Sequence, residues 1–443
     1  MKKRLPTQAI WLSLAMLASC GTPPEESDVV WAVNVGGGAY SAVDGTEYAA
    51  DESVSGGELG TIRSVKGSQD PALYESYREG DIKIAHPVAN GTYDITLHFA
   101  EPADIERDDR VFDAFAEGSR IIGDIDVMLW RDGQVRAALS VTVPNVVVND
   151  GELNIHFAAQ HKQPLLSALV VRHPGGTADT GELAWSDEFD DDGAPDPANW
   201  NIEEWTTGVV NDEDQVYTAR PRNVRVEDGH LVIEAHKEDY DGGHYTSGRL
   251  QSSGKVDILY GRVEVRAKLP RGQGTWPAIW MLSSKPFHYA TTCEDDEGRQ
   301  GSDDWQGSDD CDAWPNSGEI DIMEHVGYQM GHVHGTVHSK SYPWPLWNQR
   351  KGRILVDDVA DEFHVYALEW TPERIDIFVD DTVYLTYINE GNGWQEWPFD
   401  QPFHLILNVA IGGGWGRAGG PIDDSVFPQR MLIDYVRVYQ RQE

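Results

Sequence analysis

The chain has 443 residues, enough for two or three domains, and carries a formal net charge of −39 from 74 acidic and 35 basic residues. Such a charge repels phosphates, so nucleic acid is excluded as an expected partner. The composition suits a soluble extracellular protein, which we expect to be a monomer.

The N-terminus has the features of an export signal. A basic start is followed by a short apolar stretch at residues 10–18, and residues 17–20 (Leu-Ala-Ser-Cys) resemble a bacterial lipobox. The apolar stretch is too short to span a bilayer. We therefore expect residues 1–20 to be a lipoprotein signal peptide, residues 21–28 a tether, and Cys20 the lipidated residue. This lipid would be the only membrane contact of an exported protein at the bacterial cell surface or outer membrane; the alternative is an ordinary signal peptide with an incidental cysteine.

Short alternating runs of apolar and polar residues, typical of β-strands, occupy residues 29–173. The segment resembles the malectin family of carbohydrate-binding domains at residues 34–37 (Asn-Val-Gly-Gly), 99–101 (Phe-Ala-Glu) and 110–113 (Arg-Val-Phe-Asp). The resemblance implies a β-sandwich that binds glucose-type sugars through loop aromatics, and a structural spacer is the alternative. The candidate aromatics, each of which could instead be packing, are Tyr40, Tyr48, Tyr74 and Tyr77.

Residues 174–182 form a turn-rich stretch of small residues without hydrophobic periodicity, which predicts a linker. Helical periodicity is weak on both sides of it. We therefore expect an all-β chain in which residues 183–443 form a second, larger domain.

A strand in this second domain carries three carboxylates, on Glu319, Asp321 and Glu324. Side chains two apart in a strand share a face, so the first two acids point one way and Ile320 and Ile322 point the other way. Regular alternation would send Glu324 to the apolar face, and a single-residue bulge near Ile322 and Met323 would return it to the acidic face.

A row of acids is costly for a fold, because like charges oppose each other's ionisation. Cleavage of a glycosidic bond requires such a pair: one carboxylate attacks and another, kept protonated, donates to the leaving oxygen. The alternative is a solvated strand face in an acid-rich chain.

Residues 314–324 (Trp-Pro-Asn-Ser-Gly-Glu-Ile-Asp-Ile-Met-Glu) are similar to the signature of glycoside hydrolase family 16, and most of all to that of the bacterial laminarinases, which are endo-1,3-β-glucanases. The resemblance covers residues 183–443 and implies a β-jelly-roll of two packed antiparallel sheets with a substrate cleft. It further implies that Glu319 is the nucleophile, that Glu324 is the general acid and later the base, that Asp321 tunes the nucleophile, and that the anomeric configuration is retained.

The resemblance also implies a set of substrate-binding residues around the acids. For the tryptophans the alternative is core packing, and for the histidines of residues 332–338 it is a metal site. The predicted substrate-binding residues are Asn211, Glu213, Arg249, Trp276, Trp280, Trp314, His338 and Trp415.

No cofactor is expected for catalysis, but the resemblance implies a structural calcium ion away from the acids. Its oxygen ligands would come from Glu188, the Gly229 carbonyl and Asp434. Chelation would then lower the melting temperature and leave the mechanism untouched.

With Cys20 acylated, Cys293 and Cys311 remain, both inside an acidic insertion at residues 283–313. Export favours oxidation, so we expect these two cysteines to form a disulfide.

Taken together, these features predict a retaining endo-glycosidase that cleaves β-1,3-glucan, with a polysaccharide as its partner. Two alternatives stay open: the same fold acting on mixed-linkage β-glucan or an agarose-type galactan, and a non-catalytic surface glycan-binding protein.

Overall fold

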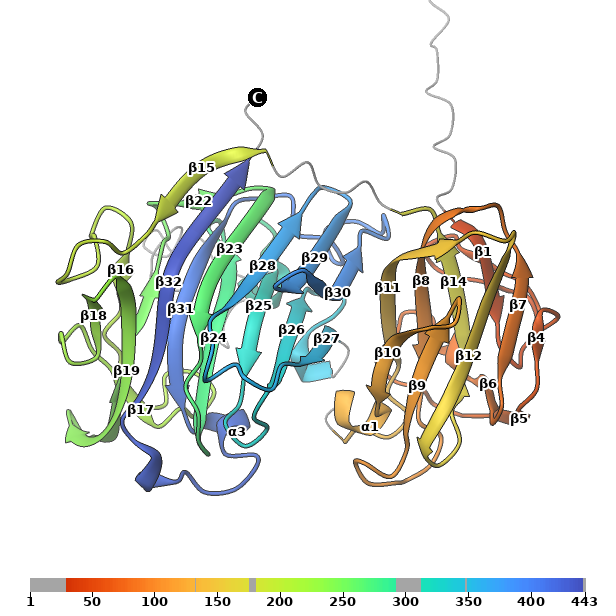
Figure 1. The fold of residues 1–443 in the computed structure, drawn as a ribbon, viewed down its shortest axis with the longest axis horizontal. Coiled ribbons are helices and arrows are strands. Elements are labelled where there is room, and N and C mark those ends of the chain that lie inside the picture. Colours follow the sequence, from red (N-terminus) through yellow and green to blue (C-terminus); the bar gives the residue numbers. More distant parts are fainter. Residues whose placement is uncertain (1–28, 132, 175–180, 292–311, 347–348, 441–443) are drawn as a thin grey trace, which may run out of the picture.

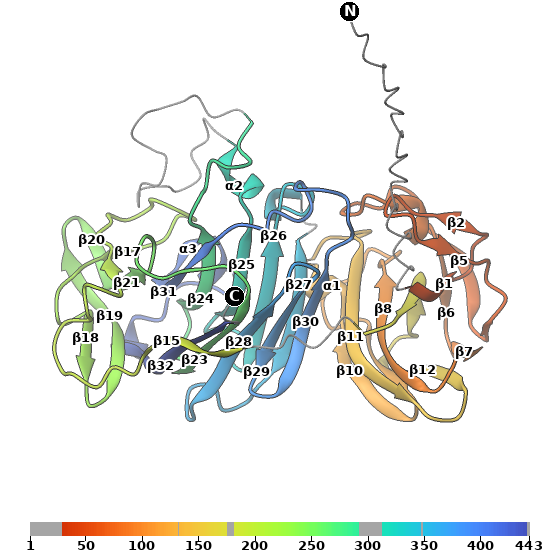
Figure 2. The same cartoon turned by 90° about the horizontal axis from the view of Figure 1, so that it is seen from above.

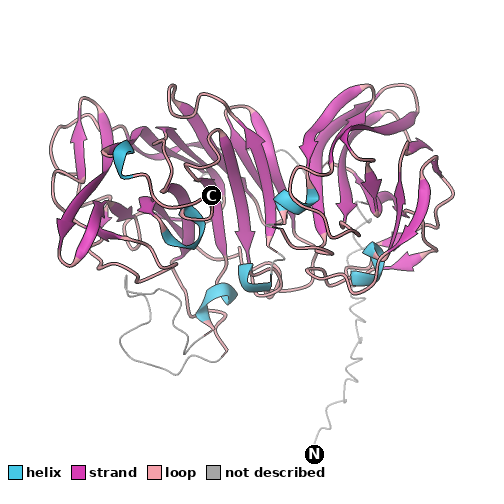
Figure 3. Cartoon of the chain, turned by 90° about the horizontal axis from the view of Figure 1, so that it is seen from below, coloured by secondary structure: helices cyan, strands magenta, loops and turns pink. Residues whose placement is uncertain are grey.

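The computed structural model describes residues 29–131, 133–174, 181–291, 312–346 and 349–440. It consists of two β-structured domains side by side, with only short helices (Figures 1 and 3). The all-β prediction is therefore confirmed. The expected lipidation of Cys20 and the expected Cys293–Cys311 disulfide lie outside the described residues and stay predictions.

The N-terminal domain is a sandwich of antiparallel sheets, with two small sheets beside it. One main sheet has the order β1 (Val29–Asn34), β14 (Ala168–Arg172), β8 (Gly91–Phe99) and β11 (Leu139–Val148). The other has the order β10 (Ser119–Ile125), β9 (Val111–Ala116), β12 (Glu152–His161), β7 (Lys83–Pro87) and β4 (Val54–Ser55). The small sheets are β13 (Leu165–Leu166), β6 (Ser76–Glu79) and β5 (Glu58–Thr61), and the pair β2 (Tyr40–Ser41) and β3 (Glu47–Tyr48).

The C-terminal domain packs two larger sheets face to face. The sheet that we call the β32 sheet has the order β17 (Gln215–Tyr217), β20 (Gly243–Ser247), β19 (His230–Tyr240), β32 (Gln429–Gln440), β23 (Gly261–Lys268), β28 (His364–Trp370), β29 (Arg374–Val379) and β30 (Thr382–Ile388). Two further strands join it, β15 (Glu182–Asp187) on β32 and β18 (Val224–Glu227) on β19.

The second sheet, which we call the β25 sheet, carries the three acids. Its order is β16 (Asn201–Ile202), β21 (Arg249–Gln251), β31 (Phe403–Ile411), β24 (Thr275–Ser283), β25 (Glu319–His325), β26 (His332–His338) and β27 (Arg350–Leu355), with β22 (Asp257–Ile258) on β31. This architecture is the two-layered jelly roll that the sequence predicts.

In the part of the chain that the structure describes, helical structure is limited to single turns. The helices in the described residues are η1 (Pro71–Tyr74), α1 (Val127–Trp130), α2 (Ala313–Asn316), η2 (Trp344–Leu346), α3 (Gly413–Gly416) and η3 (Asp424–Val426). None of these has the length and hydrophobicity of a bilayer-spanning segment.

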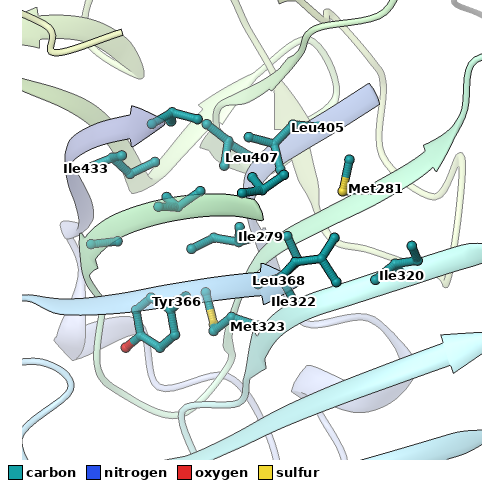
Figure 4. Close-up of a cluster of buried hydrophobic side chains, with 14 of the residues drawn as sticks. Ile279, Met281, Ile320, Ile322, Met323, Tyr366, Leu368, Leu405, Leu407 and Ile433 are labelled. Carbon is teal, nitrogen blue, oxygen red and sulfur yellow. The ribbon is translucent and has the colours of Figure 1, made fainter. Parts of the chain in front are cut away.

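The core of the C-terminal domain lies between its two sheets (Figure 4). From the β25 sheet, Ile279, Ile320 and Ile322 point into it and meet Leu368 and Ile433 of the β32 sheet. Ile320 and Ile322 flank Asp321 in the strand, so their packing in the core directs the Asp321 side chain to the opposite face of the sheet.

The two domains meet along β11 on one side and β27 and β30 on the other (Figures 1 and 2). Buried polar contacts cross the boundary. Arg374 of β29 forms an ion pair with Asp94 of β8, and Arg350 of β27 donates to the Ser140 hydroxyl of β11 at 3.1 Å. Arg374 is buried and Arg350 is partly buried, so the contact depends on the pairing of these charges.

Candidate active site

Strand β25 contains the predicted bulge. Across β26, Asp321 pairs with Thr336 and Glu324 pairs with His334, so Ile322 and Met323 both lie opposite a single residue, Gly335. Met323 joins Ile320 and Ile322 in the core, with no exposed surface. The extra residue restores Glu324 to the face of Glu319 and Asp321, and the bulge prediction is confirmed.

A tyrosine from the opposite sheet holds this bulge. The Tyr384 hydroxyl of β30 donates to the carbonyl oxygen of Ile322 at 2.5 Å. Gly335 leaves the space that the ring needs, because a Cβ at this position would lie 2.9 Å from the Tyr384 ring. Neither residue was predicted as part of the site, since the contact joins strands that are distant in the sequence.

Each outer carboxylate accepts a hydrogen bond from an indole. Trp314 donates through Nε1 to Glu319 Oε2 at 2.7 Å, and Trp276 donates through Nε1 to Glu324 Oε1 at 3.0 Å. Glu324 is therefore directed away from the isoleucines of the core. Two of the tryptophans predicted to bind substrate are placed by the structure as partners of the acids.

His338 lies beside the other two acids. Its Nε2 is 3.4 Å from Asp321 Oδ2 and 3.8 Å from Glu319 Oε1. Burial lowers the pKa of His338, so the ring is neutral at neutral pH and leaves the carboxylate charges largely uncompensated.

The buried acids hold protons more tightly than exposed carboxyl groups do. Burial, and then the charge of Asp321, raises the pKa of Glu319 to about 8. Burial and the charge of Glu324 raise the pKa of Asp321 well above its ordinary value. Glu319 and Asp321 oppose each other's ionisation, so the ligand-free pair retains a proton at neutral pH.

The described residues contain one group of three potential metal ligands whose ligand atoms lie within 4.8 Å of one another. It consists of Glu319, Asp321 and His338. Three ligands from two neighbouring strands could accept a cation. The same oxygens would have to react with a sugar, so metal binding and glycosyl transfer would compete for them.

Aromatic side chains border Glu324. The Trp276 and Trp415 rings meet edge to face at 5.5 Å, and His334 lies 5.1 Å from Trp415. The predicted loop residue Trp415 belongs to α3 and thus lies within the site. The ammonium group of Lys351 lies 5.0 Å from the centre of the Trp415 ring.

Arg249 lies among buried aromatic residues. Its guanidinium group forms an ion pair with Glu203 and lies 4.2 Å from the Trp205 ring and 4.9 Å from the Trp280 ring. The structure gives Arg249 a protein partner, and its predicted bond to sugar hydroxyls stays a prediction. Trp280 also has a protein partner, since its Nε1 donates to Asn408 at 2.8 Å.

Asn211 and Glu213 lie at the loop that contains Trp415. The Asn211 carbonyl accepts from Gly414 N at 2.8 Å, and Glu213 accepts from the Gln215 amide at 2.7 Å. Burial raises the pKa of Glu213. The structure thus places both predicted substrate-binding residues at the site, next to the loop that contains Trp415.

The predicted calcium ligands gather along one edge of β32. Along that edge, β19 pairs with residues 429–433 of β32 and β15 pairs with residues 436–440. The ends of β15 and β19 therefore meet beside Asp434. Glu188 follows β15 and Gly229 precedes β19.

Both carboxylates of this set contact arginine. Glu188 accepts two hydrogen bonds from Arg437, at 3.0 and 2.9 Å, and Asp434 accepts one from Arg266 at 2.6 Å. The oxygen donors suit calcium in kind and in place, and the ion would have to displace these guanidinium groups.

Two family models match the chain. The model of glycosyl hydrolases family 16 matches residues 211–298 and 301–437, and the malectin domain model matches residues 29–173. Among curated proteins, the chain is 48% identical over 265 residues to a beta-glucanase of Rhodothermus marinus, covering 58% of this chain and 85% of that protein. It is 34% identical over 289 residues to glucan endo-1,3-beta-glucosidase A1 of Niallia circulans, covering 59% of this chain but only 38% of that longer protein.

Solved structures are similar over the same part of the chain. The laminarinase from Rhodothermus marinus matches with a TM-score of 0.52 and 48% identity, covering 59% of this chain and 98% of that one. SCLam, a non-specific endo-beta-1,3(4)-glucanase from family GH16, matches with a TM-score of 0.52 and 42% identity, covering 61% of this chain and 95% of that one.

Proposed function

Since the chain belongs to family 16 of the glycosyl hydrolases, we propose that it is an endo-acting, retaining enzyme that cleaves β-1,3-glucan of the laminarin type. The observation that carries this proposal is the bulge in β25, which gathers Glu319, Asp321 and Glu324 on one face. The names of the Rhodothermus marinus and Niallia circulans relatives support the substrate.

The reaction uses the two outer acids in turn. Glu319 attacks the anomeric carbon, and Glu324 donates its proton to the oxygen of the departing glucan chain, which leaves a covalent glycosyl–enzyme. Glu324 then takes a proton from water as the water attacks that carbon, which releases Glu319 with the configuration retained. For the attack, the proton that Glu319 and Asp321 share must lie on Asp321, which then donates a hydrogen bond to Glu319 and leaves the nucleophile ionised.

Proton NMR of the first product tests the mechanism. We expect the β-anomer to form first and the α-anomer to follow by mutarotation. An α-anomer at first turnover would mean inversion and would rule out a glycosyl–enzyme at Glu319.

The choice of glucan is open to a second candidate, mixed-linkage β-glucan, because the similar SCLam is described as acting on β-1,3(4)-glucan. A galactan is the third, since a keratan-sulfate endo-1,4-beta-galactosidase of Sphingobacterium multivorum is 34% identical over 285 residues. Product profiles on laminarin, barley β-glucan and agarose separate these candidates, and we expect oligosaccharides of several lengths from laminarin. A chain that releases no reducing sugar from any of them would be a glycan-binding protein instead.

The untested features of the chain belong to the same proposal. We propose that Cys20 carries a lipid and holds a monomeric enzyme at the cell surface; Cys20→Ala should then abolish partition into detergent. We further propose that Cys293 and Cys311 form a disulfide, which should appear as a linked peptide in a non-reducing digest.

A calcium ion at Glu188, Gly229 and Asp434 would supply stability and no chemistry. We expect calcium to raise the melting temperature of EDTA-treated protein without changing its rate on laminarin. Asp434→Asn should remove this response. If neither calcium nor EDTA changed the melting temperature, Arg437 and Arg266 would keep their ion pairs with these carboxylates and no calcium would bind.

A further inference from the structure

Lys351 brings a positive charge to the face of the β25 sheet that carries the acids. In the register of the sheet, Lys351 of β27 lies opposite Thr336 of β26, and Thr336 lies opposite Asp321 of β25. Residues directly opposite each other in neighbouring strands share a face, so the Lys351 side chain leaves the sheet on the same side as Asp321. Lys351 is only 8% exposed. Burying an ammonium group is costly, so its position depends on compensating interactions.

The ammonium group lies among the neighbours of Glu324. It is 5.0 Å from the centre of the Trp415 ring. The Trp415 ring meets the ring of Trp276, the indole donor of Glu324, at 5.5 Å. It also meets the ring of His334, which is the residue opposite Glu324 in β26, at 5.1 Å. Lys351 therefore lies on the Glu324 side of the row of acids.

The electrostatic effects of Lys351 agree with this placement. Burial and, after it, the charge of Lys351 lower the pKa of His334 well below its ordinary value. Burial and the charge of Glu324 raise the pKa of Asp321, and the charge of Lys351 opposes that rise. His338 is neutral at neutral pH, so the permanent positive charge that acts on Asp321 comes from Lys351.

In the proposed reaction, negative charge moves toward this lysine. As a Glu319 oxygen forms its bond to the anomeric carbon, the glycosidic bond breaks, its electron pair goes to the departing oxygen, and that oxygen takes the proton of Glu324. The negative charge of Glu319 is thereby lost in the glycosyl ester, while Glu324 becomes a carboxylate. A fixed cation beside the place where charge develops stabilises the transition state more than the ground state.

We propose that Lys351 is a positioning residue of the reaction and acts through Glu324: its ammonium group stabilises the negative charge that Glu324 gains when it releases its proton. The same group holds the Trp415 ring beside Trp276 through a cation–π contact. The inference rests on the proposed glycosidase function and adds to it a residue from a strand that carries none of the acids.

The test compares Lys351→Met, which removes the charge and keeps an unbranched side chain, with Lys351→Arg, which keeps the charge. On laminarin we expect Lys351→Met to lower kcat/KM by about tenfold, and Lys351→Arg to retain most of the wild-type value. An aryl β-glucoside oligomer with an acidic phenol needs little proton donation, so Lys351→Met should lower kcat/KM on it by about twofold at most. A merely structural role of Lys351 would lower kcat/KM on both substrates equally.

Binding is measured separately, by isothermal titration of laminarihexaose into Glu319→Gln protein with and without Lys351→Met. We expect equal affinities, because the charge that Lys351 stabilises is absent before the proton is transferred. A loss of affinity as large as the loss of kcat/KM on laminarin would make Lys351 a substrate-binding residue and would overturn the proposal.

Lys268→Met is the matched control, because Lys268 of β23 lies 5.1 Å from the centre of the Phe363 ring on the other sheet. It should leave both rates unchanged. The proposal is overturned if Lys351→Met equals the wild type on laminarin, if it loses equally on both substrates, or if Lys351→Arg is as slow as Lys351→Met.

If Lys351→Met does not fold, Lys351→Gln decides by the same comparisons. A wild-type protein that hydrolyses neither substrate would refute the proposed function, and this inference with it. A wild-type protein that hydrolyses both, with no selective loss in the variants, would refute the inference about Lys351 alone.

Discussion

At the scale of single residues, the site is a row of acids in which each outer member has its own indole donor. Trp314 supports Glu319 and Trp276 supports Glu324, while His338 approaches Asp321 without carrying a charge. The two outer acids therefore have different partners and, in the proposed reaction, different tasks. Their variants should fail in different ways.

Glu324→Gln removes the proton donor, so we expect hydrolysis of laminarin to fall by about 10²–10⁴-fold. An aryl β-glucoside oligomer with an acidic phenol needs little proton donation, and the loss on it should be much smaller. Glu319→Gln should abolish turnover of both substrates and spare binding. Glu227→Gln, at an exposed ion pair, is the matched control. Equal losses on both substrates for Glu324→Gln would exclude it as the acid.

The raised pKa of Glu319 makes the stability of the protein depend on pH. In the unfolded chain a glutamate has a pKa of about 4.3, whereas in the folded protein it is about 8. The contribution of the protonated group is complete below the lower value and is lost as the pH rises through the higher one. The melting temperature should therefore fall from pH 5 to pH 9, and less steeply in Glu319→Gln. Parallel curves for the two proteins would contradict this.

The sequence could predict the acids because alternation is local. Glu319 and Asp321 share a face by spacing alone, and the bulge follows from the position of Glu324. The contacts of Arg249 were out of reach, because its partner Glu203 lies 46 positions away and neither belongs to a pattern. An ion pair between residues that are distant in the sequence can be recognised only from the three-dimensional structure.

At the scale of elements, the bulge in β25 is held from behind as well as by its own strand. A bulge leaves backbone groups outside the ladder, and the Tyr384 hydroxyl satisfies one of them at Ile322. Strand β25 itself was predictable from alternation. The brace was not, since it joins the two sheets and depends on the absence of a side chain at Gly335.

Tyr384→Phe tests this brace. Losing one hydrogen bond should lower the free energy of unfolding by about 0.5–1.5 kcal/mol, and a loosened bulge should lower kcat on laminarin because Glu324 is less fixed. Tyr366→Phe is the matched control, since the hydroxyl of Tyr366 is buried in the same domain with no hydrogen-bond partner in the described structure. Equal effects on stability and kcat in the two variants would show that the contact to Ile322 has no special role.

At the scale of the whole molecule, the two domains form one body through charged contacts removed from solvent. Arg374 and Asp94 are 280 positions apart, and Asp94 is 1% exposed. No local pattern in the sequence relates these residues, and a turn-rich linker suggests independent motion. The structure instead places the N-terminal domain in contact with β27 and β30.

Arg374→Ala would leave the Asp94 carboxylate buried without its cation, at a cost of about 3–5 kcal/mol. We expect one transition in the calorimetric melt of the wild type and two in that of the variant, because the domains no longer melt together. Arg271→Ala, which removes an exposed pair with Asp361, should cost about 1 kcal/mol at most and keep one transition. A single transition in Arg374→Ala would mean that other contacts couple the domains.

The position of β27 has one more consequence. Among the strands that the structure describes, it is the last of the β25 sheet, with β26 on one side and none on the other, and the N-terminal domain contacts it through β11. Unpaired strand edges attract other chains. A shortened protein that begins at residue 183 would bare this edge together with Arg350, and it should aggregate at concentrations at which the full chain stays dispersed.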